Sequence, residues 1–492
     1  MNIKYVIAYD VGTTAVKGVL VSSEGEIIES ESINIETIYE SGNKEQQPEK
    51  WYSAVCEISK KFTLKVLKED IIGVIMSGQM QDLILVDRNG DSISNAILYS
   101  DGRASEEAKE IQKKIGKEEL YQVLGNQLDG SFPLSKLLWI KNNNPEIYRL
   151  INKIMISSKD YCVGKLTGRY ITDTTSATTS GIMDIRSKEF RVDWLTRLGI
   201  EDSFLPDLCR PDHYIGGVSK QASLESGLHE NTRIYAGIGD AGATTLASGI
   251  NHAGEININL GTSGWVAEIS DHVLEKEGVF NLVSADAKNY INIVPFLNSG
   301  NVHQWVAETF AGGISQSLKY EEIGKKLKFR RPGSGNLLFL PYIVGERFPI
   351  MDNNIKGAYY GITQKTTDID LISAAMEGVA YSLRQGLEEI CENPTKVTLI
   401  GGGAKESVWC QIISDVLGQN ITAFLNTEYL PALSICEFVF YDCKVWGDTD
   451  DFPYRFVRKN QTITYYPNFA NKELYDFNFH NFKTLYPRLK GI

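Results

Sequence analysis

Two strand–turn–strand units, each turning at a Gly-Thr pair, most constrain how this sequence can fold. In the first, apolar runs over 3–9 and 16–22 flank the turn Asp10-Val11-Gly12-Thr13-Thr14. In the second, runs over 255–260 and 265–269 flank Gly261-Thr262-Ser263-Gly264. Apolar, β-rich runs separated by glycine turns predict β-hairpins. One such hairpin therefore lies near the start of each half of the chain.

The first turn offers the groups that a nucleoside triphosphate needs. Gly12 lets the backbone approach a ligand closely, because it has no Cβ. Amides of the turn and the hydroxyls of Thr13 and Thr14 can donate to phosphate oxygens, and the Asp10 carboxylate can hold Mg²⁺ directly or through water. We include Lys17, inside the second run, in this predicted ATP site. An ordinary hairpin with a solvated Asp is the alternative.

The second turn favours a shared binding site, because two glycine hairpins that face each other across a cleft can hold one triphosphate from both sides. Gly261 and Thr262 accordingly join the predicted nucleotide site. This site differs from the two common glycine-rich nucleotide motifs. The sequence contains no G-x-x-x-x-G-K-[S/T], and no G-x-G-x-x-G follows a strand.

Length and charge limit the architecture and the partners. A chain of 492 residues is too long for one ordinary core, and we expect two domains, over 1–248 and 249–492. The net charge of −12 argues against nucleic acid or an anionic membrane as a general partner. No apolar run approaches the ~20 residues of a membrane span, and the first residues do not resemble a signal peptide. Seven scattered cysteines without metal-ligand spacing indicate reduced thiols in a cytoplasm.

Polar residues at two strand ends form a candidate sugar site. A predicted strand over 71–76 leads into Met80 and Gln81, and a later strand leads into Asp101 and Arg103. Open α/β sheets place ligands at the carboxyl ends of their strands. Paired carboxylate and guanidinium groups suit the vicinal diols of a sugar, although a buried structural salt bridge explains the same two residues equally well.

Asp240 is the candidate catalytic base. It follows a predicted strand over 234–238 and stands between small residues, where backbone and ligand crowd together. In phosphoryl transfer a carboxylate can accept the proton of the attacking hydroxyl, and an Asp with the ordinary pKa of about 3.9 is ionised at neutral pH. An Asp that caps the helix through Leu246 is the alternative.

A third glycine turn lies in the second half of the chain. A strand over 397–400 opens into Gly401-Gly402-Gly403-Ala404, and a helix follows from about 406 to 417. Glycines between a strand and a helix N-terminus let a flat or anionic ligand contact the backbone, and the adenosine end of a nucleotide is the natural candidate. A bare glycine turn is the alternative. Before this turn, apolar spacing predicts a helix over 371–391 that is capped by Asp370.

Two long motifs and several short ones carry a family resemblance. The long motifs are Ser131-x-Pro133-x-x-Lys136-Leu137-x-Trp139-Ile140 and Gly357-x-Tyr359-x-Gly361-Ile362 followed by Asp370-Leu371-x-x-Ala374-Ala375-Met376-Glu377. Short ones include the glycine turns described above and Leu340-Pro341-Tyr342 with Gly345-Glu346-Arg347. With these motifs the chain resembles the FGGY carbohydrate kinases, and within them the xylulokinases, as far as about residue 425.

The resemblance implies an actin/hexokinase-type α/β fold, in which two ribonuclease H-like domains flank an active-site cleft. It implies an ATP- and Mg²⁺-dependent sugar kinase with an N-terminal sugar-binding domain, a C-terminal nucleotide-binding domain and a homodimer as an open option. The implied roles are Mg²⁺ and phosphate binding for Asp10 and Thr13, γ-phosphate contact for Thr262, adenosine contact for Gly402 and Gly403, proton acceptance for Asp240, and sugar contact for Met80, Gln81 and Asp101.

Two segments depart from the family pattern. Gln79-Met80-Gln81-Asp82 stands where xylulokinases have Gln-Met-His-Gly, which leaves another ketose, a polyol or a sugar acid as alternative substrates. The family has a run of smaller residues where this chain has Leu430-Pro431-Ala432-Leu433-Ser434-Ile435-Cys436. The added bulk would displace a helix or alter nucleotide binding. A non-catalytic sugar sensor and an actin-like ATPase are the remaining functional alternatives.

Overall fold

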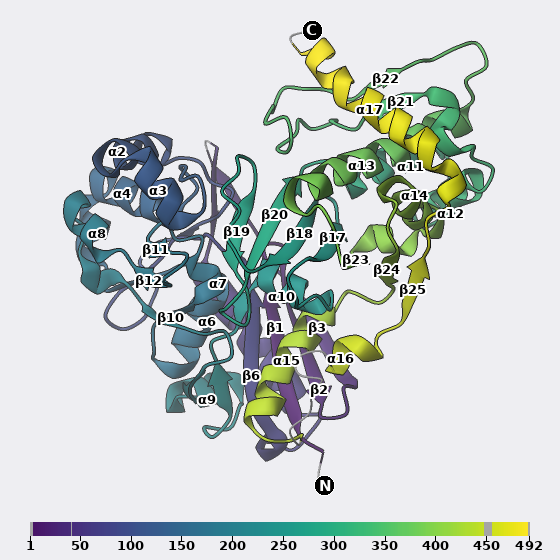
Figure 1. The fold of residues 1–492 in the computed structure, drawn as a ribbon. Coiled ribbons are helices and arrows are strands. Elements are labelled where there is room, and N and C mark those ends of the chain that lie inside the picture. Colours follow the sequence, from purple (N-terminus) through teal and green to yellow (C-terminus); the bar gives the residue numbers. More distant parts are fainter. Residues whose placement is uncertain (1–2, 41, 447–454, 491–492) are drawn as a thin grey trace.

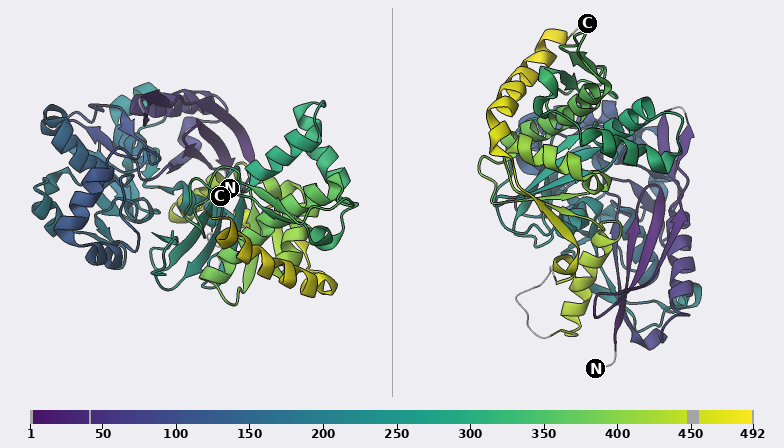
Figure 2. Two further views of the ribbon diagram at one scale, coloured as in Figure 1. Left: turned by 90° about the horizontal axis from the view of Figure 1, so that it is seen from above. Right: turned by 90° about the vertical axis from the view of Figure 1, so that its right-hand side faces the viewer.

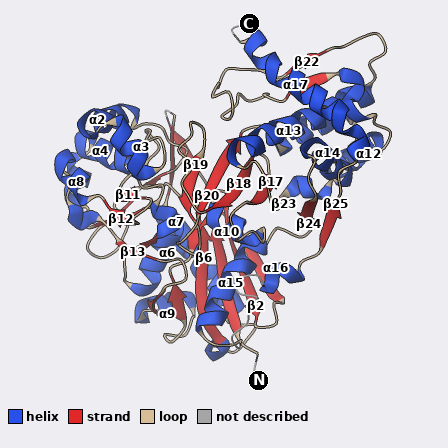
Figure 3. Ribbon diagram, viewed as in Figure 1, coloured by secondary structure: helices blue, strands red, loops and turns tan. Residues whose placement is uncertain are grey.

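The computed structural model describes residues 3–40, 42–446 and 455–490. The chain forms two lobes, each built around one large β-sheet (Figure 1). Seen from above in Figure 2, the first half of the chain occupies one lobe and most of the second half occupies the other. Figure 3 shows that the strands of both large sheets gather in the middle of the molecule, with helices around them.

The first lobe contains a seven-stranded sheet in the order β14-β15-β6-β1-β2-β3, in which β16 also pairs with β6. Strand β1 is antiparallel to β2, whereas β6 is parallel to β1, β15 and β16. The strands are β1 (Tyr5–Val11), β2 (Ala15–Ser22), β3 (Ile27–Asn34), β6 (Ile71–Gly78), β14 (Tyr214–Gly217), β15 (Arg233–Tyr235) and β16 (Ile238–Gly239).

The second lobe contains a seven-stranded sheet in the order β19-β20-β18-β17-β23-β24-β25. Strand β17 is antiparallel to β18 and parallel to β23, which is in turn parallel to β24. The strands are β17 (Glu255–Leu260), β18 (Gly264–Ser270), β19 (Phe280–Val283), β20 (Tyr290–Phe296), β23 (Lys396–Ile400), β24 (Ile421–Phe424) and β25 (Thr462–Tyr465).

The two sheets share one topology. In each, an antiparallel hairpin with a third antiparallel strand is continued on the other side by two parallel strands, giving β3-β2-β1-β6-β15 and β20-β18-β17-β23-β24. This repeated order confirms the two ribonuclease H-like α/β domains that the resemblance implied. Both predicted Gly-Thr hairpins are present, as β1–β2 and β17–β18, and each contributes two adjacent strands to its sheet.

Alternation along β1 builds two cores on the two faces of the first sheet. Ile7, Tyr9 and Val11 point to one face and pack with α1 and α6, whereas Val6 and Ala8 point to the other and pack with α10 and α15. These helices are α1 (Pro48–Phe62), α6 (Ser158–Thr167), α10 (Asp240–Ala247) and α15 (Leu430–Asp442).

Helix α15 crosses from the second half of the sequence to the first sheet. The helix lies against the first sheet (Figure 1). Its apolar side chains pack against β1, β6 and α10. Met80 and Ile250, which follow β6 and α10, pack in turn on the inner face of β18 and β20. The region around α10 and α15 therefore joins the two lobes.

The remaining elements surround the sheets. In the first lobe these are β4 (Ile38–Glu40), β5 (Asn43–Gln46), β7 (Ile84–Val86), β8 (Ala96–Ile97), α2 (Ser105–Ile115), α3 (Lys117–Leu124), α4 (Pro133–Asn143), α5 (Pro145–Leu150), β9 (Lys153–Met155), β10 (Ile171–Asp173), α7 (Thr174–Ala177), β11 (Met183–Asp184), β12 (Glu189–Phe190), α8 (Val192–Leu198), β13 (Asp207–Cys209) and α9 (Lys220–Ser226). In the second half they are α11 (Gly300–Phe310), α12 (Gln316–Leu327), β21 (Leu338–Leu340), β22 (Ala358–Tyr360), α13 (Asp368–Ile390), α14 (Ser407–Leu417), α16 (Arg455–Lys459) and α17 (Lys472–Leu489).

Two local predictions were wrong in detail. The strand over 234–238 is broken into β15 and β16, because Gly237 between them has a φ of +72° that interrupts the extended backbone. The cap of α13 is Thr367, and Asp370 is its partner in a capping box, so the helix begins three residues earlier than its apolar pattern indicates.

In the part of the chain that the structure describes, no helix is both long and apolar enough to span a membrane.

Candidate active site

Asp10 stands near the end of β1, between two polar neighbours. It pairs in register with Ser77 of β6, whose hydroxyl donates to Asp10 Oδ1 at 3.1 Å. Across the hairpin it pairs with Lys17 of β2. Burial raises the pKa of Asp10 above its ordinary value, while Ser77 and Lys17 oppose that rise by favouring the ionised form. Lys17 Nζ also lies 3.7 Å from Glu428 Oε1. This cation therefore interacts with the carboxylates of both Asp10 and Glu428.

The first turn is braced by a side-chain network that sequence reasoning missed. The Thr13 hydroxyl donates to Gln79 Oε1 at 2.8 Å, so its proton is already used in a hydrogen bond within the protein. Gln46 Nε2 donates to the Thr13 carbonyl at 2.6 Å, and Gln79 Nε2 donates to Gln46 Oε1 at 3.0 Å. Thr14 is exposed and Gly12 is half-buried. Gln79 follows a strand end and could have been noticed, whereas nothing in the local pattern marks Gln46.

The second and third glycine turns meet at one cleft of about 690 Å³. Its lining includes Gly261, Thr262, Gly300, His303, Gly402 and Gly403. The structure thus brings together four residues of the predicted nucleotide site. Ala404, the fifth from this half of the chain, is fully buried in the core behind the turn.

The two glycines of the third turn differ in their surroundings. A Cβ on Gly402 would meet no atom within 4 Å, so its Cα faces open space. A Cβ on Gly403 would lie 2.8 Å from both Leu260 and Trp409, so packing alone requires glycine there. Gly402 is therefore the position at which the backbone is open to a ligand.

Asp240 is the first residue of α10, directly after β16. Its Oδ1 accepts a hydrogen bond from Ala241 N at 2.7 Å, while Gly239 occupies the cap position. The surrounding protein and the nearby Asp10 carboxylate raise the pKa of Asp240 to about 7. The side chain is nevertheless open to solvent, and screening by water weakens both effects. A carboxylate that titrates near neutrality is suited to exchange a proton.

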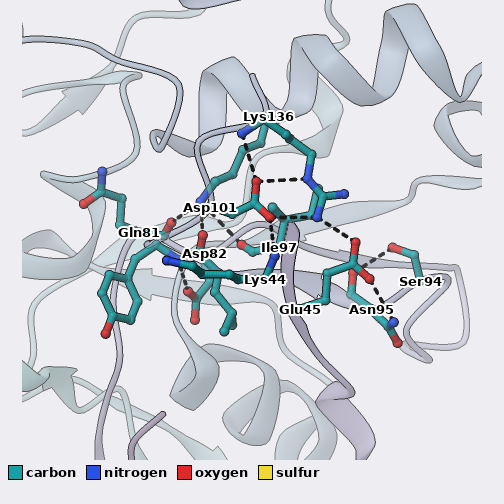
Figure 4. Close-up of polar contacts among 12 residues, drawn as sticks. Lys44, Glu45, Gln81, Asp82, Ser94, Asn95, Ile97, Asp101 and Lys136 are labelled. Atoms are coloured by element: carbon teal, nitrogen blue, oxygen red, sulfur yellow. Dashed lines mark hydrogen bonds and ion pairs between the residues drawn. The ribbon is translucent and has the colours of Figure 1, made fainter. Parts of the chain in front are cut away.

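Met80 and Gln81 follow β6 at the same end of the sheet. Met80 is buried against Gly239 and the second lobe, at the junction between the two halves. Gln81 has a φ of 64°, a left-handed conformation that is uncommon for a residue with a Cβ. Its Nε2 donates to Ser131 Oγ at 2.7 Å. Figure 4 shows Gln81 at the margin of a network of buried polar side chains.

Within that network Asp101 and Arg103 form a buried ion pair. Arg103 donates from Nε to Asp101 Oδ1 at 3.0 Å and from Nη2 to Oδ2 at 2.7 Å, and it also contacts Glu45 at 2.8 Å. Lys44 N donates to Asp101 Oδ2 at 2.6 Å. The structure shows the buried structural salt bridge that was one of the two interpretations of Asp101 and Arg103. The other interpretation, contact of these residues with a sugar, stays a prediction.

Lys136 and Asp82 complete the network (Figure 4). The Lys136 Nζ donates to the carbonyls of Gln81 and Leu98 at 2.9 and 2.8 Å, and so ties both candidate sugar segments together. Asp82 is fully buried, and its Oδ1 accepts from Tyr99 N at 2.9 Å. Burial raises the pKa of Asp82 to about 8 and lowers the pKa of Lys136 to about 8, while the opposite charge of each partner reduces these shifts. Lys136 was visible in the first signature motif, but its partners were not.

The bulky segment 430–436 forms the first turns of α15 and fills the core. Leu430 packs with Ala247, Ile400 and Phe424, while Ile435 and Cys436 pack against the first sheet. None of its residues is among those described as lining the 690 Å³ cleft. These side chains are therefore buried between the lobes, and displacement of the helix or altered nucleotide binding stays a prediction.

Comparison with known proteins decides the family. The N-terminal domain of the FGGY family of carbohydrate kinases matches residues 5–247, and the C-terminal domain of that family matches residues 256–429. This chain belongs to the FGGY family. As an FGGY kinase it is a phosphotransferase that uses ATP and a sugar.

Individual relatives of this FGGY kinase act on two kinds of sugar. It is 29% identical to the xylulose kinase of Staphylococcus xylosus over 98% of this chain and 99% of that protein. It is also 29% identical to the gluconokinase of Bacillus subtilis, over 85% of this chain and 83% of that protein. The crystal structure of xylulose kinase from Lactobacillus acidophilus superposes with a TM-score of 0.89 at 26% identity and covers 99% of both chains.

Proposed function

We propose that the protein transfers the γ-phosphate of ATP to a hydroxyl of a ketose such as D-xylulose, with Asp240 as the general base. The observation that carries this proposal is the proximity of Asp240 to Asp10, at the ends of the two strands that flank β6. The oxygen of the sugar hydroxyl would attack the γ-phosphorus while Asp240 takes the hydroxyl proton, and ADP would leave.

We assign sugar binding to a domain over 1–248 and nucleotide binding to a domain over 249–492. The nucleotide would extend along the cleft from Gly402 and Gly403, at the adenosine, to Gly261 and Thr262, at the phosphates. The first turn, with Gly12, Thr13, Thr14 and Lys17, would contact the phosphates from the other lobe. Closure of the lobes would exclude water, so that phosphate passes to the sugar and not to solvent.

Mg²⁺ suits the position of Asp10. Burial raises the pKa of Asp10, and Asp10 in turn raises the pKa of Asp240, so a cation would relieve the repulsion between the two carboxylates. Among the described residues, no group of three or more His, Cys, Asp and Glu could form a metal site. One carboxylate is enough for an ion that keeps several waters and phosphate ligands. When bound, the metal would neutralise charge on the phosphates.

The charges around the candidate sugar residues favour a neutral ketose over a sugar acid. A carboxylate substrate needs a free cation, but Lys136 already donates to main-chain carbonyls and Arg103 is paired with Asp101 and Glu45. Asp101 adds negative charge to the same region, because its burial is outweighed by hydrogen bonds from Arg103 and from Lys44 N, which hold its pKa below the ordinary value. Gluconate remains the second candidate because of the gluconokinase relative, followed by ribulose-type ketoses and polyols.

A coupled ADP-release assay over D-xylulose, D-ribulose, gluconate and simple polyols tests the proposal. We expect a ketose to give the highest kcat/KM. Fastest turnover with gluconate would overturn the choice of a neutral substrate. No turnover with any of them, together with no Mg-ATP binding in calorimetry, would leave the sugar-sensor alternative.

We also propose a cytoplasmic location, supported by seven cysteines that are all free. Assembly as a homodimer stays a prediction.

A further inference from the structure

The second glycine turn is held from behind by the start of α11. Gly300 N donates to the Gly261 carbonyl at 2.8 Å, and Asn301 N donates to the Thr262 carbonyl at 3.0 Å. A Cβ on Gly300 would lie 2.4 Å from Gly261 O, so the contact depends on glycine. The N–H of a trans peptide points opposite to its C=O. The N–H groups of Thr262 and Ser263, which share peptides with these two carbonyls, therefore point away from α11. Amides turned away in this way are available to a phosphate.

The loop that leads into α11 is held by a buried carboxylate. Glu346 is fully buried, and its Oε1 accepts from Leu297 N at 2.6 Å and from Arg347 N at 2.8 Å. Its Oε2 accepts from Asn298 Nδ2 at 2.9 Å. Asn298 in turn donates to the Gly345 carbonyl at 2.5 Å and accepts from Val344 N at 3.3 Å.

A second amide closes the connection between this loop and the turn. Asn301 Oδ1 accepts from Ser299 N at 2.8 Å, and Asn301 Nδ2 donates to the Leu297 carbonyl at 3.1 Å. The same residue donates its backbone N–H to the turn. An unbroken series of hydrogen bonds thus runs from Glu346 through the 297–301 loop to Thr262.

We infer that Glu346 is a positioning residue for nucleotide binding, which acts through the 297–301 loop to hold the Gly261–Thr262 turn with its amides facing the phosphates. This inference rests on the proposed function, because it needs a nucleotide in the cleft. Burying a carboxylate costs free energy unless its charge is hydrogen-bonded. An apolar side chain could not accept from the two backbone N–H groups and the Asn298 amide.

Glu377 of α13 provides a matched control. It is a buried carboxylate of the same lobe, and it accepts from Gly333 N at 2.9 Å, Ser334 Oγ at 2.8 Å and Tyr475 OH at 3.2 Å. None of these partners is among the described residues that line the cleft. Glu346→Gln and Glu377→Gln each turn one accepting oxygen into an NH₂ group that faces donors. Both variants should therefore lose thermal stability.

The experiment compares Glu346→Gln, Glu377→Gln and the wild type by calorimetry with Mg-ATP, KM for ATP, KM for the sugar, and Tm. We expect Glu346→Gln to weaken Mg-ATP binding about tenfold, because phosphate-binding amides lose their alignment, and to leave the sugar KM unchanged. Glu377→Gln should bind Mg-ATP as the wild type does. If Glu346→Gln does not fold, Asn298→Ala should reproduce its effect in the same direction.

Two results would overturn the inference alone while the wild type still binds Mg-ATP. One is nucleotide binding in Glu346→Gln and Asn298→Ala that equals that of Glu377→Gln. The other is an equal weakening of ATP and sugar binding, which would indicate general loosening of the fold. A wild type that binds no Mg-ATP would instead overturn the proposed function together with the inference.

Discussion

Asp10 and Asp240 are brought to the same edge of the first sheet by one shared neighbour, Ser77 of β6. Asp10 pairs with Ser77 from one side, and Ile238, two residues before Asp240, pairs with it from the other. The proximity of the two carboxylates contributes to the raised pKa of Asp240. Asp240, whose pKa is about 7, therefore lies beside Asp10, whose position suits a metal ion.

Replacing Asp240 by Asn keeps the size of the side chain but removes its ability to accept a proton. We expect kcat to fall by roughly 10²–10⁴, with sugar binding retained in calorimetry. The matched control is Asp207→Asn, at an exposed position at the start of β13, where kcat should not change. Near-normal turnover in Asp240→Asn would remove this residue from the role of base.

The pH dependence should follow the raised pKa of Asp240. Only the ionised carboxylate accepts a proton, so kcat/KM should reach its plateau above about pH 7 and fall about tenfold per unit as the pH drops below it. Asp10→Asn removes the neighbouring like charge, so residual activity in this variant should persist to lower pH. An acid limb near the ordinary Asp pKa of about 3.9 in the wild type would contradict the assignment.

The two glycines of the third turn should separate binding from packing. In Gly402→Ala the new methyl group enters open space, so we expect an unchanged Tm and a raised KM for ATP. In Gly403→Ala the methyl group meets Leu260 and Trp409, which should destabilise the fold by about 1–3 kcal/mol. Thermal melts and ATP titrations of both variants check this, and an unchanged KM in Gly402→Ala would argue against adenosine at this turn.

Breaking the buried ion pair should show how much of its role is structural. Arg103→Met leaves Asp101 buried without its cation, which should cost about 3–5 kcal/mol in the free energy of unfolding. Arg210→Met, in the more exposed pair with Asp212, should cost no more than about 1 kcal/mol. Urea titrations compare the two. Equal stability losses would contradict a mainly structural role for the pair. A lost sugar affinity without lost stability would favour direct sugar contact by Arg103.

Local patterns in the sequence predicted the elements that depend on near neighbours. The hairpins around Gly12 and Gly261 and the long helix α13 follow from alternation, glycine turns and apolar spacing within a few residues. The errors were also local. Gly237 interrupts a strand through its positive φ, and the cap of α13 is the reciprocal pair Thr367 and Asp370, which begins before the apolar pattern does.

Contacts between distant segments decided what the site residues can do. The sequence placed Asp101 and Arg103 at a strand end, but only the fold pairs them with each other and with Glu45. It marked the bulk of 430–436, but only the packing of α15 on the first sheet shows where that bulk goes. The brace of Gln46, Gln79 and Thr13 joins three separate segments that no local pattern connects.

The amino-acid sequence by itself determined the repeated hairpin, the family and the candidate groups for phosphoryl transfer, because each depends on a few adjacent residues. The tertiary structure alone decided that Asp10 raises the pKa of Asp240, which cations are already paired and how the second turn is held. Those properties depend on burial and charge, which are set by residues far apart in the chain that folding brings into contact.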